Sequence, residues 1–123
     1  MWEKVLVNEG SEFVHVAEIE KEVVGFLSAG PARAEELDYD GEIYGFYIED
    51  QYQDQGIGKE LFKASVNKFK DYEFTTIFVW VLKENPAVKF YRKMGGKKVE
   101  EANLEIGGKE YKELALGWDD INN

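Results

Sequence analysis

Two glycines spaced two residues apart stand between a β-branched and aromatic run that ends at Ile48 and an amphipathic run that begins at Ile57. They belong to the segment Gln53, Asp54, Gln55, Gly56, Ile57, Gly58 and Lys59. Glycine lets the backbone approach a ligand closely, and a following helix points its free N–H groups and positive dipole end at the same spot. The segment is therefore predicted to be an anion-binding turn that would fit a pyrophosphate.

Two other phosphate-binding loops are excluded by residues in this segment and directly after it. A Walker A loop requires Gly at the position of Gln53 and Ser or Thr at the position of Glu60. The dinucleotide fingerprint requires a third glycine where Leu61 stands. The pattern that remains, Gln-x-x-Gly-x-Gly, resembles the acetyl-coenzyme A (acetyl-CoA) loop of the GNAT superfamily of N-acetyltransferases.

A second motif downstream is similar to the same family. Asn85 is followed by an alanine two residues later, by the pair Phe90 and Tyr91, and by a glycine where the helix should end. GNAT enzymes commonly carry these features in this order after a buried strand. Together, the two motifs extend the resemblance over roughly residues 13–118.

The resemblance implies an α/β fold with a single GNAT-like domain over residues 1–123, a mixed, splayed β-sheet flanked by helices. Family members usually begin with a strand and one or two helices that help to wall the acceptor site. Here only residues 1–11 precede the first expected hairpin. The fold is therefore expected to be shortened at its N-terminus, with part of the amine-binding wall missing, shortened or supplied by a partner chain.

Hydrophobic patterns predict the elements that must position these motifs. Apolar residues recur at helical spacing after Ile57, and Asn85 can cap a second helix. The predicted order is strands over 13–19, 23–27 and 42–48, a helix from 57, a strand over 74–82, a helix ended by Gly95 and Gly96, and strands over 97–104 and 110–118 around Gly107 and Gly108.

Amine acetylation needs a base for the amine, stabilisation of the developing oxyanion and an acid for the departing thiolate. In GNAT enzymes the free N–H groups of the splayed strand meet the acetyl carbonyl and the pantetheine arm. By position, this implies Phe46, Tyr47 and Ile48. Gly45 beside them permits a bulge or a close approach.

The resemblance also implies Tyr91 as the acid and Asn85 as a ligand of the pantetheine. A phenol with the ordinary pKa of about 10 is protonated at neutral pH and can donate. Glu42 stands eleven residues before Gln53, an offset that resembles that of a glutamate in some GNAT enzymes, and is the candidate base, although a glutamate needs burial or a water relay for this task. Glu49 is its rival. A core aromatic and an exposed strand-start carboxylate are the structural alternatives for Tyr91 and Glu42.

Composition limits the remaining possibilities. A chain of 123 residues with 44% apolar content suits one domain, and the absence of cysteine excludes a thiolate nucleophile and a zinc–thiolate site. The formal charge of −10 disfavours nucleic acid and favours cationic partners. No membrane-spanning stretch or cationic leader is present, so a cytoplasmic protein is predicted. A homodimer is left open.

Other titratable residues give no further site. His15, the one histidine, is remote from both motifs and is expected to be structural. The pairs Glu35-Glu36 and Asp119-Asp120 lack a histidine partner, so no metal is expected. The sequence favours an N-acetyltransferase that transfers acetyl from acetyl-CoA to a primary amine by direct attack in a ternary complex. A non-catalytic acyl-CoA-binding regulatory module is the alternative, and the amine acceptor, a small molecule or a peptide, is not identified further.

Overall fold

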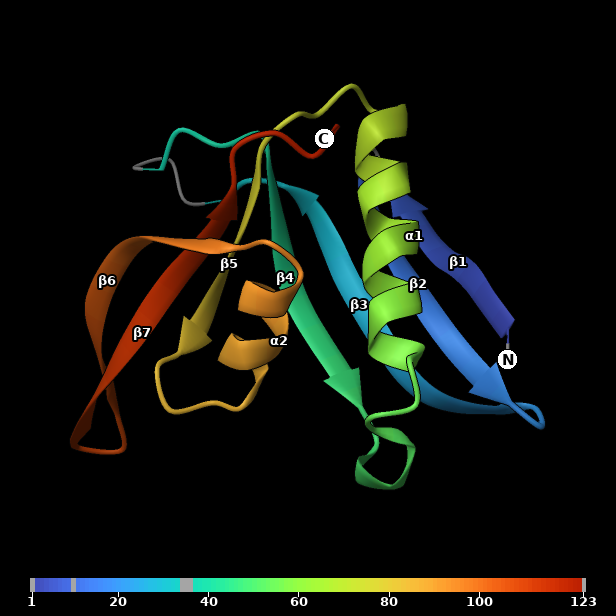
Figure 1. The fold of residues 1–123 in the computed structure, drawn as a ribbon, viewed down its shortest axis with the longest axis horizontal. Helices are drawn as coiled ribbons and strands as arrows, with labels where there is room; N and C mark the ends of the chain where they lie inside the picture. Colours follow the sequence, from blue (N-terminus) through green and yellow to red (C-terminus); the bar gives the residue numbers. More distant parts are fainter. Residues whose placement is uncertain (1, 10, 34–36, 123) are drawn as a thin grey trace.

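A seven-stranded mixed sheet with both helices on one of its faces forms the fold, in a computed structural model that describes residues 2–9, 11–33 and 37–122 (Figure 1). The elements are β1 (Trp2–Glu9), β2 (Glu12–Ile19), β3 (Glu22–Pro31), β4 (Gly41–Ile48), the short 3-10 helix η1 (Asp50–Tyr52), α1 (Ile57–Asp71), β5 (Ile77–Leu82), α2 (Ala87–Lys93), β6 (Lys97–Ile106) and β7 (Lys109–Trp118). The strand order is β1-β2-β3-β4-β5-β7-β6. The predicted α/β class with a mixed sheet is confirmed.

Two tight hairpins frame the sheet. Gly107 and Gly108, with φ of 58° and 81°, join β6 to β7, as the sequence predicted. Glu20 and Lys21 join β2 to β3 with φ of 52° and 71°. Both loops have two residues with positive φ, which matches the right-handed twist of the flanking strands. Non-glycine residues tolerate these angles less well than glycine does.

The structure differs from the sequence prediction at three strands. One is β3, which was predicted over 23–27 and extends to Pro31. β1, antiparallel to β2, was not predicted, although its sequence contains β-favouring residues such as Val5 and Val7. β5 was predicted from residue 74 and begins at Ile77. The carboxylate of Asp40 accepts hydrogen bonds from the N–H groups of Thr75 (2.8 Å) and Thr76 (3.3 Å), which keeps these two residues out of the strand.

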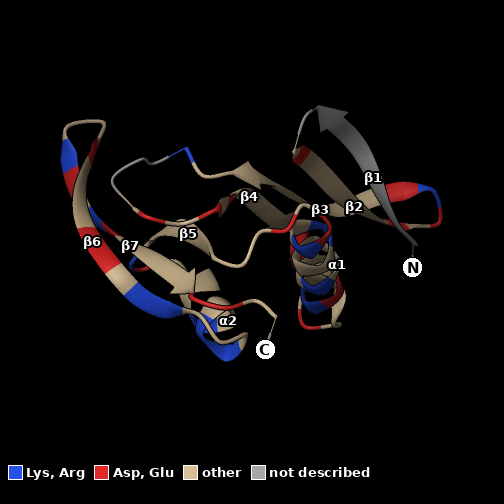
Figure 2. Cartoon of the chain, turned by 90° about the horizontal axis from the view of Figure 1, so that it is seen from above, with Lys and Arg blue, Asp and Glu red and all other residues tan. Residues whose placement is uncertain are grey.

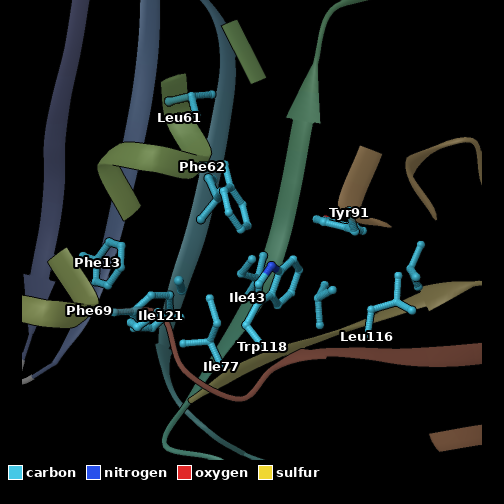
Figure 3. Packing of buried hydrophobic residues seen from close by; sticks show 14 of the residues in the cluster. Phe13, Ile43, Leu61, Phe62, Phe69, Ile77, Tyr91, Leu116, Trp118 and Ile121 are labelled. Carbon is cyan, nitrogen blue, oxygen red and sulfur yellow. The ribbon is translucent and has the colours of Figure 1, made fainter. Parts of the chain in front are cut away.

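The core lies between the sheet and the two helices (Figure 3). α1 buries Leu61, Phe62 and Phe69 at helical spacing against β2, β3 and β4. Trp118 packs against Phe62 of α1 (5.2 Å between ring centroids) and Tyr91 of α2 (6.1 Å), which ties both helices to one face. Figure 2 shows the other face of the curved sheet without a helix. Among the described residues, neither helix is long and apolar enough to cross a membrane.

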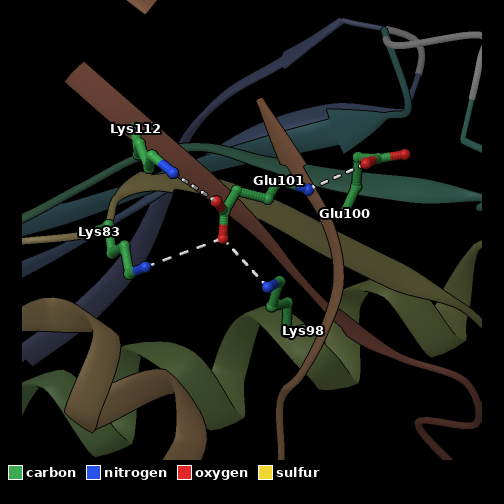
Figure 4. Close-up of polar contacts among 5 residues, drawn as sticks. All are labelled: Lys83, Lys98, Glu100, Glu101 and Lys112. Carbon is green, nitrogen blue, oxygen red and sulfur yellow. Dashed lines mark hydrogen bonds and ion pairs between the residues drawn. The ribbon is translucent and has the colours of Figure 1, made fainter. Parts of the chain in front are cut away.

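A charge network stabilises the β6–β7 hairpin (Figure 4). The Glu101 carboxylate lies 3.0 Å from Lys98, 3.5 Å from Lys112 and 4.0 Å from Lys83. A hydrogen bond from Lys98 is the main reason why the pKa of Glu101 falls below its usual value. These lysines therefore already have a carboxylate partner, unlike a cluster that is open to an anionic ligand.

β4 and β5 diverge, as the predicted splay requires. The two strands are parallel and pair only through Gly41–Ile43 and Ile77–Val79. The pairing of β3 with β4 shifts where Ser28 faces Gly45 and Ala29 faces Ile43, which leaves Tyr44 as an extra residue. Such a bulge bends a strand. The bulge therefore accounts for the separation of β4 from β5 beyond Ile43.

Candidate functional site

The glycine loop forms the N-terminus of α1. Gly56 is the N-cap with φ of 84°, and Asp54 also adopts the left-handed region with φ of 63°. The N–H of Glu60 makes the first helical hydrogen bond, to the carbonyl of Gly56 (3.1 Å). The N–H groups of Ile57, Gly58 and Lys59 precede it and have no partner within the helix. The predicted loop therefore leads directly into a helix N-terminus with three N–H groups that have no helical partner.

The two glutamines of the motif hold the loop in place. The Gln53 side-chain amide donates to the carbonyl of Ile48 (3.0 Å) and to Asp50 Oδ1 (3.3 Å). The Gln55 amide donates to the carbonyl of Gln51 (3.1 Å). Both glutamine side chains thus fix the path from β4 to α1 through hydrogen bonds within the chain.

A basic side chain that sequence analysis missed lies beside this loop. Lys63 lines a shallow surface hollow together with Gly56, Lys59, Glu60 and Asn67. Lys59 and Lys63 are four residues apart and so occupy the same face of α1. That spacing is the signal that could have identified Lys63. Its ammonium group adds positive charge at the helix N-terminus.

The three predicted β4 positions lie on the diverging part of the strand. β4 keeps β3 along one edge, while no described strand pairs with its other edge beyond Ile43. Alternate N–H groups of a strand point to each edge. Of Phe46, Tyr47 and Ile48, Tyr47 is 52% exposed on the helix-free face, where its ring centroid lies 6.3 Å from that of Phe26.

An aromatic cluster joins the glycine loop to the second motif. Phe46 lies 5.4 Å from Phe90 and 6.1 Å from Tyr91, measured between ring centroids. A Cβ atom at Gly58 would lie 3.5 Å from Phe46 and 3.6 Å from Phe90. The structure therefore brings Gly58, β4 and α2 together, as the resemblance implied.

Tyr91 is deeply placed in this cluster. Its side chain is 4% exposed, and its hydroxyl makes no hydrogen bond within the part of the chain that the structure describes. Burial raises the pKa of Tyr91 above its ordinary value. The phenol is therefore protonated at neutral pH. It is also a weaker acid than a free tyrosine.

Asn85 caps α2, as predicted. Its Oδ1 accepts a hydrogen bond from the N–H of Ala87 (2.8 Å), and its carbonyl accepts one from the N–H of Val88 (3.0 Å). The residue is exposed at the end of β5 that diverges from β4. This position leaves it available for a ligand that lies between the two strands.

The two candidate bases lie at opposite ends of β4. Glu42 sits where β4 still pairs with β5, opposite Phe78, and its Oε1 accepts a hydrogen bond from the N–H of Arg33 (2.8 Å). Glu49 lies seven residues further on, about 20 Å away at the rise of an extended strand. It lines a rim hollow with Tyr47, Asp50 and Gln51. The two carboxylates therefore cannot serve one reacting atom.

The other titratable residues singled out in the sequence, His15 and the two acidic pairs, add no second site among the described residues. His15 is buried against Phe13 beneath α1, in agreement with a structural role. Asp119 accepts a hydrogen bond from Tyr39 (2.8 Å), and Asp120 from the N–H of Asn122 (2.9 Å). No cluster of metal-ligating side chains occurs among residues 2–9, 11–33 and 37–122. Glu35 and Glu36 lie outside the described residues.

Comparison with known proteins gives consistent results. The model of the Acetyltransferase (GNAT) family matches residues 2–96. The uncharacterized N-acetyltransferase YuaI of Bacillus subtilis is 41% identical over 110 residues, which cover 89% of this chain and 64% of YuaI. The chain thus spans a little under two thirds of that relative.

Solved structures share the fold at low sequence identity. A ribosomal-protein-alanine N-acetyltransferase from Brucella melitensis has a TM-score of 0.76 at 22% identity and is matched over 88% of this chain and 68% of its own. A GNAT family acetyltransferase from Elizabethkingia anophelis with acetyl-CoA bound has a TM-score of 0.70 at 19% identity, over 89% and 76% of the two chains.

Proposed function

Because this chain belongs to the GNAT acetyltransferase family, we propose that it is an N-acetyltransferase that transfers the acetyl group of acetyl-CoA to a primary amine. The observation that carries this proposal is the glycine loop at the N-terminus of α1, directly beside the diverging strands β4 and β5. The loop can bind phosphate, and the divergence of the two strands leaves N–H groups of β4 unpaired.

The residues of the loop fit a pyrophosphate. A Cβ atom at Gly56 would meet nothing within 4 Å, so the backbone is open to an approaching group. We assign the pyrophosphate to the N–H groups of Ile57, Gly58 and Lys59, with the charges of Lys59 and Lys63 beside them. The pantetheine arm is assigned to the diverging edge of β4 and to Asn85.

The acetyl thioester supplies an activated carbonyl, and the chain's own groups would manage the protons and the developing charge. Glu42 takes the proton of the acceptor ammonium through a water relay, and the neutral amine attacks directly. The N–H groups of β4 near Phe46 stabilise the negative charge on the carbonyl oxygen. Tyr91 donates its proton towards the thiolate that leaves. The chain has no cysteine to carry the acetyl group, which supports direct attack.

The burial of Tyr91 favours a second candidate function. A phenol that is 4% exposed and packed among Phe46, Phe90 and Trp118 resembles a core residue as much as a proton donor. A non-catalytic acyl-CoA-binding regulatory module would keep the glycine loop and need no acid. The cytoplasmic location, the absence of a metal and the homodimer remain predictions.

Ligand-dependent melting tests the donor site. Acetyl-CoA should raise the melting temperature more than a phosphate-free acetyl-pantetheine thioester does, because a ligand bound to the native state alone stabilises it. Equal shifts from the two thioesters would contradict the loop assignment.

The Gly58→Val variant tests the same site from the protein side. The added side chain has tolerable neighbours in Phe46 and Phe90, so the fold should persist. We expect acetyl-CoA binding, measured by calorimetry, to weaken at least tenfold, or about 1.4 kcal/mol. Ala102→Val on β6 adds bulk far from the loop and is the matched control.

A screen of primary amines for thiol release from acetyl-CoA then separates the two candidate functions. Release that depends on one amine class supports the acetyltransferase. Coenzyme binding without release by any amine in a broad screen would favour the regulatory module.

A further inference from the structure

The helix-free face of the sheet holds a cation of the chain itself among acidic and aromatic groups. The guanidinium carbon of Arg33 lies 3.5 Å from the centroid of the Tyr44 ring. One of its nitrogens, Nη2, lies 3.5 Å from Glu12 Oε1. A guanidinium stacked on an aromatic ring and paired with a carboxylate is a recurrent way of binding a cation.

Glu42 belongs to the same cluster. Its Oε1 accepts the hydrogen bond from the N–H of Arg33, and the Tyr44 hydroxyl donates to the carbonyl of Pro31. Burial is the main reason why the pKa of Tyr44 is raised, and the charges of Arg33, Glu12 and Glu42 all act on it. Tyr44 therefore lies within the electrostatic influence of all three charged residues.

A glycine makes this arrangement possible. A Cβ atom at Gly30 would lie 2.7 Å from the Tyr44 hydroxyl oxygen and 2.9 Å from Glu12 Cγ. Any larger residue at this position would push these two side chains away from β3. The absence of a side chain at Gly30 thus lets the ring from β4 and the carboxylate from β2 meet across β3.

The cluster adjoins the place where the proposed reaction would occur. Tyr44 is the bulge residue directly after Ile43, the last residue of β4 that pairs with β5. Glu42 is the proposed base. The Glu12 carboxylate lies against the Arg33 guanidinium and the Glu42 carboxylate accepts from the Arg33 backbone N–H, so a positive charge is favoured there.

We propose that Glu12, Tyr44 and Glu42 form a subsite for a cationic group of the acceptor, and that Arg33 occupies this subsite as an internal competitor. Arg33 is then a specificity-determining residue. Acceptors with several positive charges displace its guanidinium, whereas weakly charged amines do not. The role in acceptor choice rests on the proposed function, but the binding of a cation can be measured without any turnover.

The opposite role for Arg33, as an anchor for an acceptor carboxylate, is disfavoured by the same geometry. One face of the guanidinium is covered by Tyr44, and Glu12 lies against one of its nitrogens. The Glu12 carboxylate beside the guanidinium would also repel an anion. Tighter binding of an anionic amine by the wild type than by an Arg33 variant would therefore overturn the proposal.

Binding of spermidine to the wild type and to Arg33→Ala, measured by calorimetry with acetyl-CoA present and absent, tests the subsite. We expect the variant to bind spermidine about tenfold more tightly, because one stacking contact and one exposed ion pair no longer compete. Lys109→Ala removes a different exposed cation that lies over an aromatic ring, 5.5 Å from the Tyr111 ring centroid. It changes the net charge equally and should leave spermidine binding as in the wild type.

A second substitution keeps the test decisive. In the Arg33→Ala background, the further substitution Glu12→Gln should weaken spermidine binding until it is no tighter than in the wild type. Unchanged or weaker binding in Arg33→Ala, with its acetyl-CoA melting shift intact, would refute the subsite. Tighter spermidine binding without thiol release from any amine would refute the proposed function and leave the subsite standing. Thiol release from an amine, together with equal spermidine binding by the wild type and Arg33→Ala, would refute the subsite and leave the proposed function standing.

Discussion

Tyr91 shows how the surroundings of one residue set the limits of its chemistry. Burial keeps the phenol protonated, which an acid needs, but it also makes the phenolate unfavourable. Full proton transfer to a thiolate, whose conjugate acid has a pKa of about 8.5, is then uphill. Donation of a strong hydrogen bond that shares the proton is the more favourable contribution.

Tyr91→Phe isolates that contribution. The ring packing against Phe46 and Trp118 stays, so acetyl-CoA binding should change little. Turnover should fall towards the lower end of the roughly 10²–10⁴-fold range for a lost general acid. Single-turnover kinetics with an amine that supports wild-type turnover provide the measurement, and a wild-type rate in the variant would refute the acid role.

His15 gives the protein a pH dependence of its own. Burial lowers the pKa of His15, and the charge of Lys68 lowers it further. Neither ring nitrogen has a hydrogen-bond partner among the described residues. Since the unfolded chain binds a proton near pH 6.5 and the folded chain does so at a lower pH, stability falls as the pH drops below about 6.5.

His15→Leu should remove that dependence. The free energy of unfolding of the wild type should decrease between pH 7 and pH 5.5, with a slope of at most about 1.4 kcal/mol per pH unit from this residue. The leucine variant should have a flatter profile in urea denaturation over the same range. Parallel profiles would show that other groups are responsible.

At the residue scale, the sequence predicted groups of residues that are close together in the chain and missed groups that only the folded sheet brings together. Gly56 and Gly58 were predictable because a helix start and its loop are contiguous. Lys63 needed only helical spacing. Glu12, Arg33 and Tyr44 come from β2, the segment after β3, and β4, so only the sheet register brings them together.

Among the elements, the β2–β3 turn is less well matched to its sequence than the β6–β7 turn. Lys21 adopts φ of 71° at a position where Gly108 of the other hairpin adopts 81°. A non-glycine residue in this region costs roughly 1–2 kcal/mol relative to its preferred angles. The second residue of such a turn is therefore a favourable site for substitution by glycine.

Lys21→Gly should raise the free energy of unfolding by about 1 kcal/mol, with part of the gain offset by the greater freedom of glycine in the unfolded chain. Thermal or urea denaturation provides the measurement. Gly108→Ala, which imposes a Cβ atom on the equivalent angle, should shift stability in the opposite direction. A destabilised Lys21→Gly protein would contradict the strain assigned to the turn.

The spacing of apolar residues predicted whether each element is a helix or a strand, but not the residues at which it begins and ends. The run from residue 74 to Leu82 is apolar enough for a longer strand, but Asp40 accepts hydrogen bonds from Thr75 and Thr76 and delays its start. Gly45 indicated a possible bulge. The bulge lies at the preceding residue, Tyr44, because register across β3 decides which residue is extra.

At the scale of the whole molecule, the charge of −10 acts on any cationic acceptor before contact. For a polycationic amine, kcat/KM should fall steeply as salt is raised, because the Debye length shrinks from about 10 Å at 0.1 M to about 3 Å at 1 M. The salt dependence of binding or hydrolysis of a neutral thioester, measured over the same salt range, serves as the control. A salt-independent kcat/KM would show that the overall charge serves only to keep the protein in solution.

The three-residue junction between β4 and β5 also has a consequence for how the chain reaches its native state. β2, β3 and β4 follow one another through antiparallel neighbours, so their pairings are local and should form early. Pairing of β4 with β5, by contrast, closes the long loop that contains α1, and it forms only a few hydrogen bonds to offset the entropy lost. It should therefore form after the folding barrier.

Ile43→Val is expected to accelerate unfolding and leave the refolding rate nearly unchanged in stopped-flow experiments. A slower refolding rate in that variant would instead place the junction in the folding nucleus.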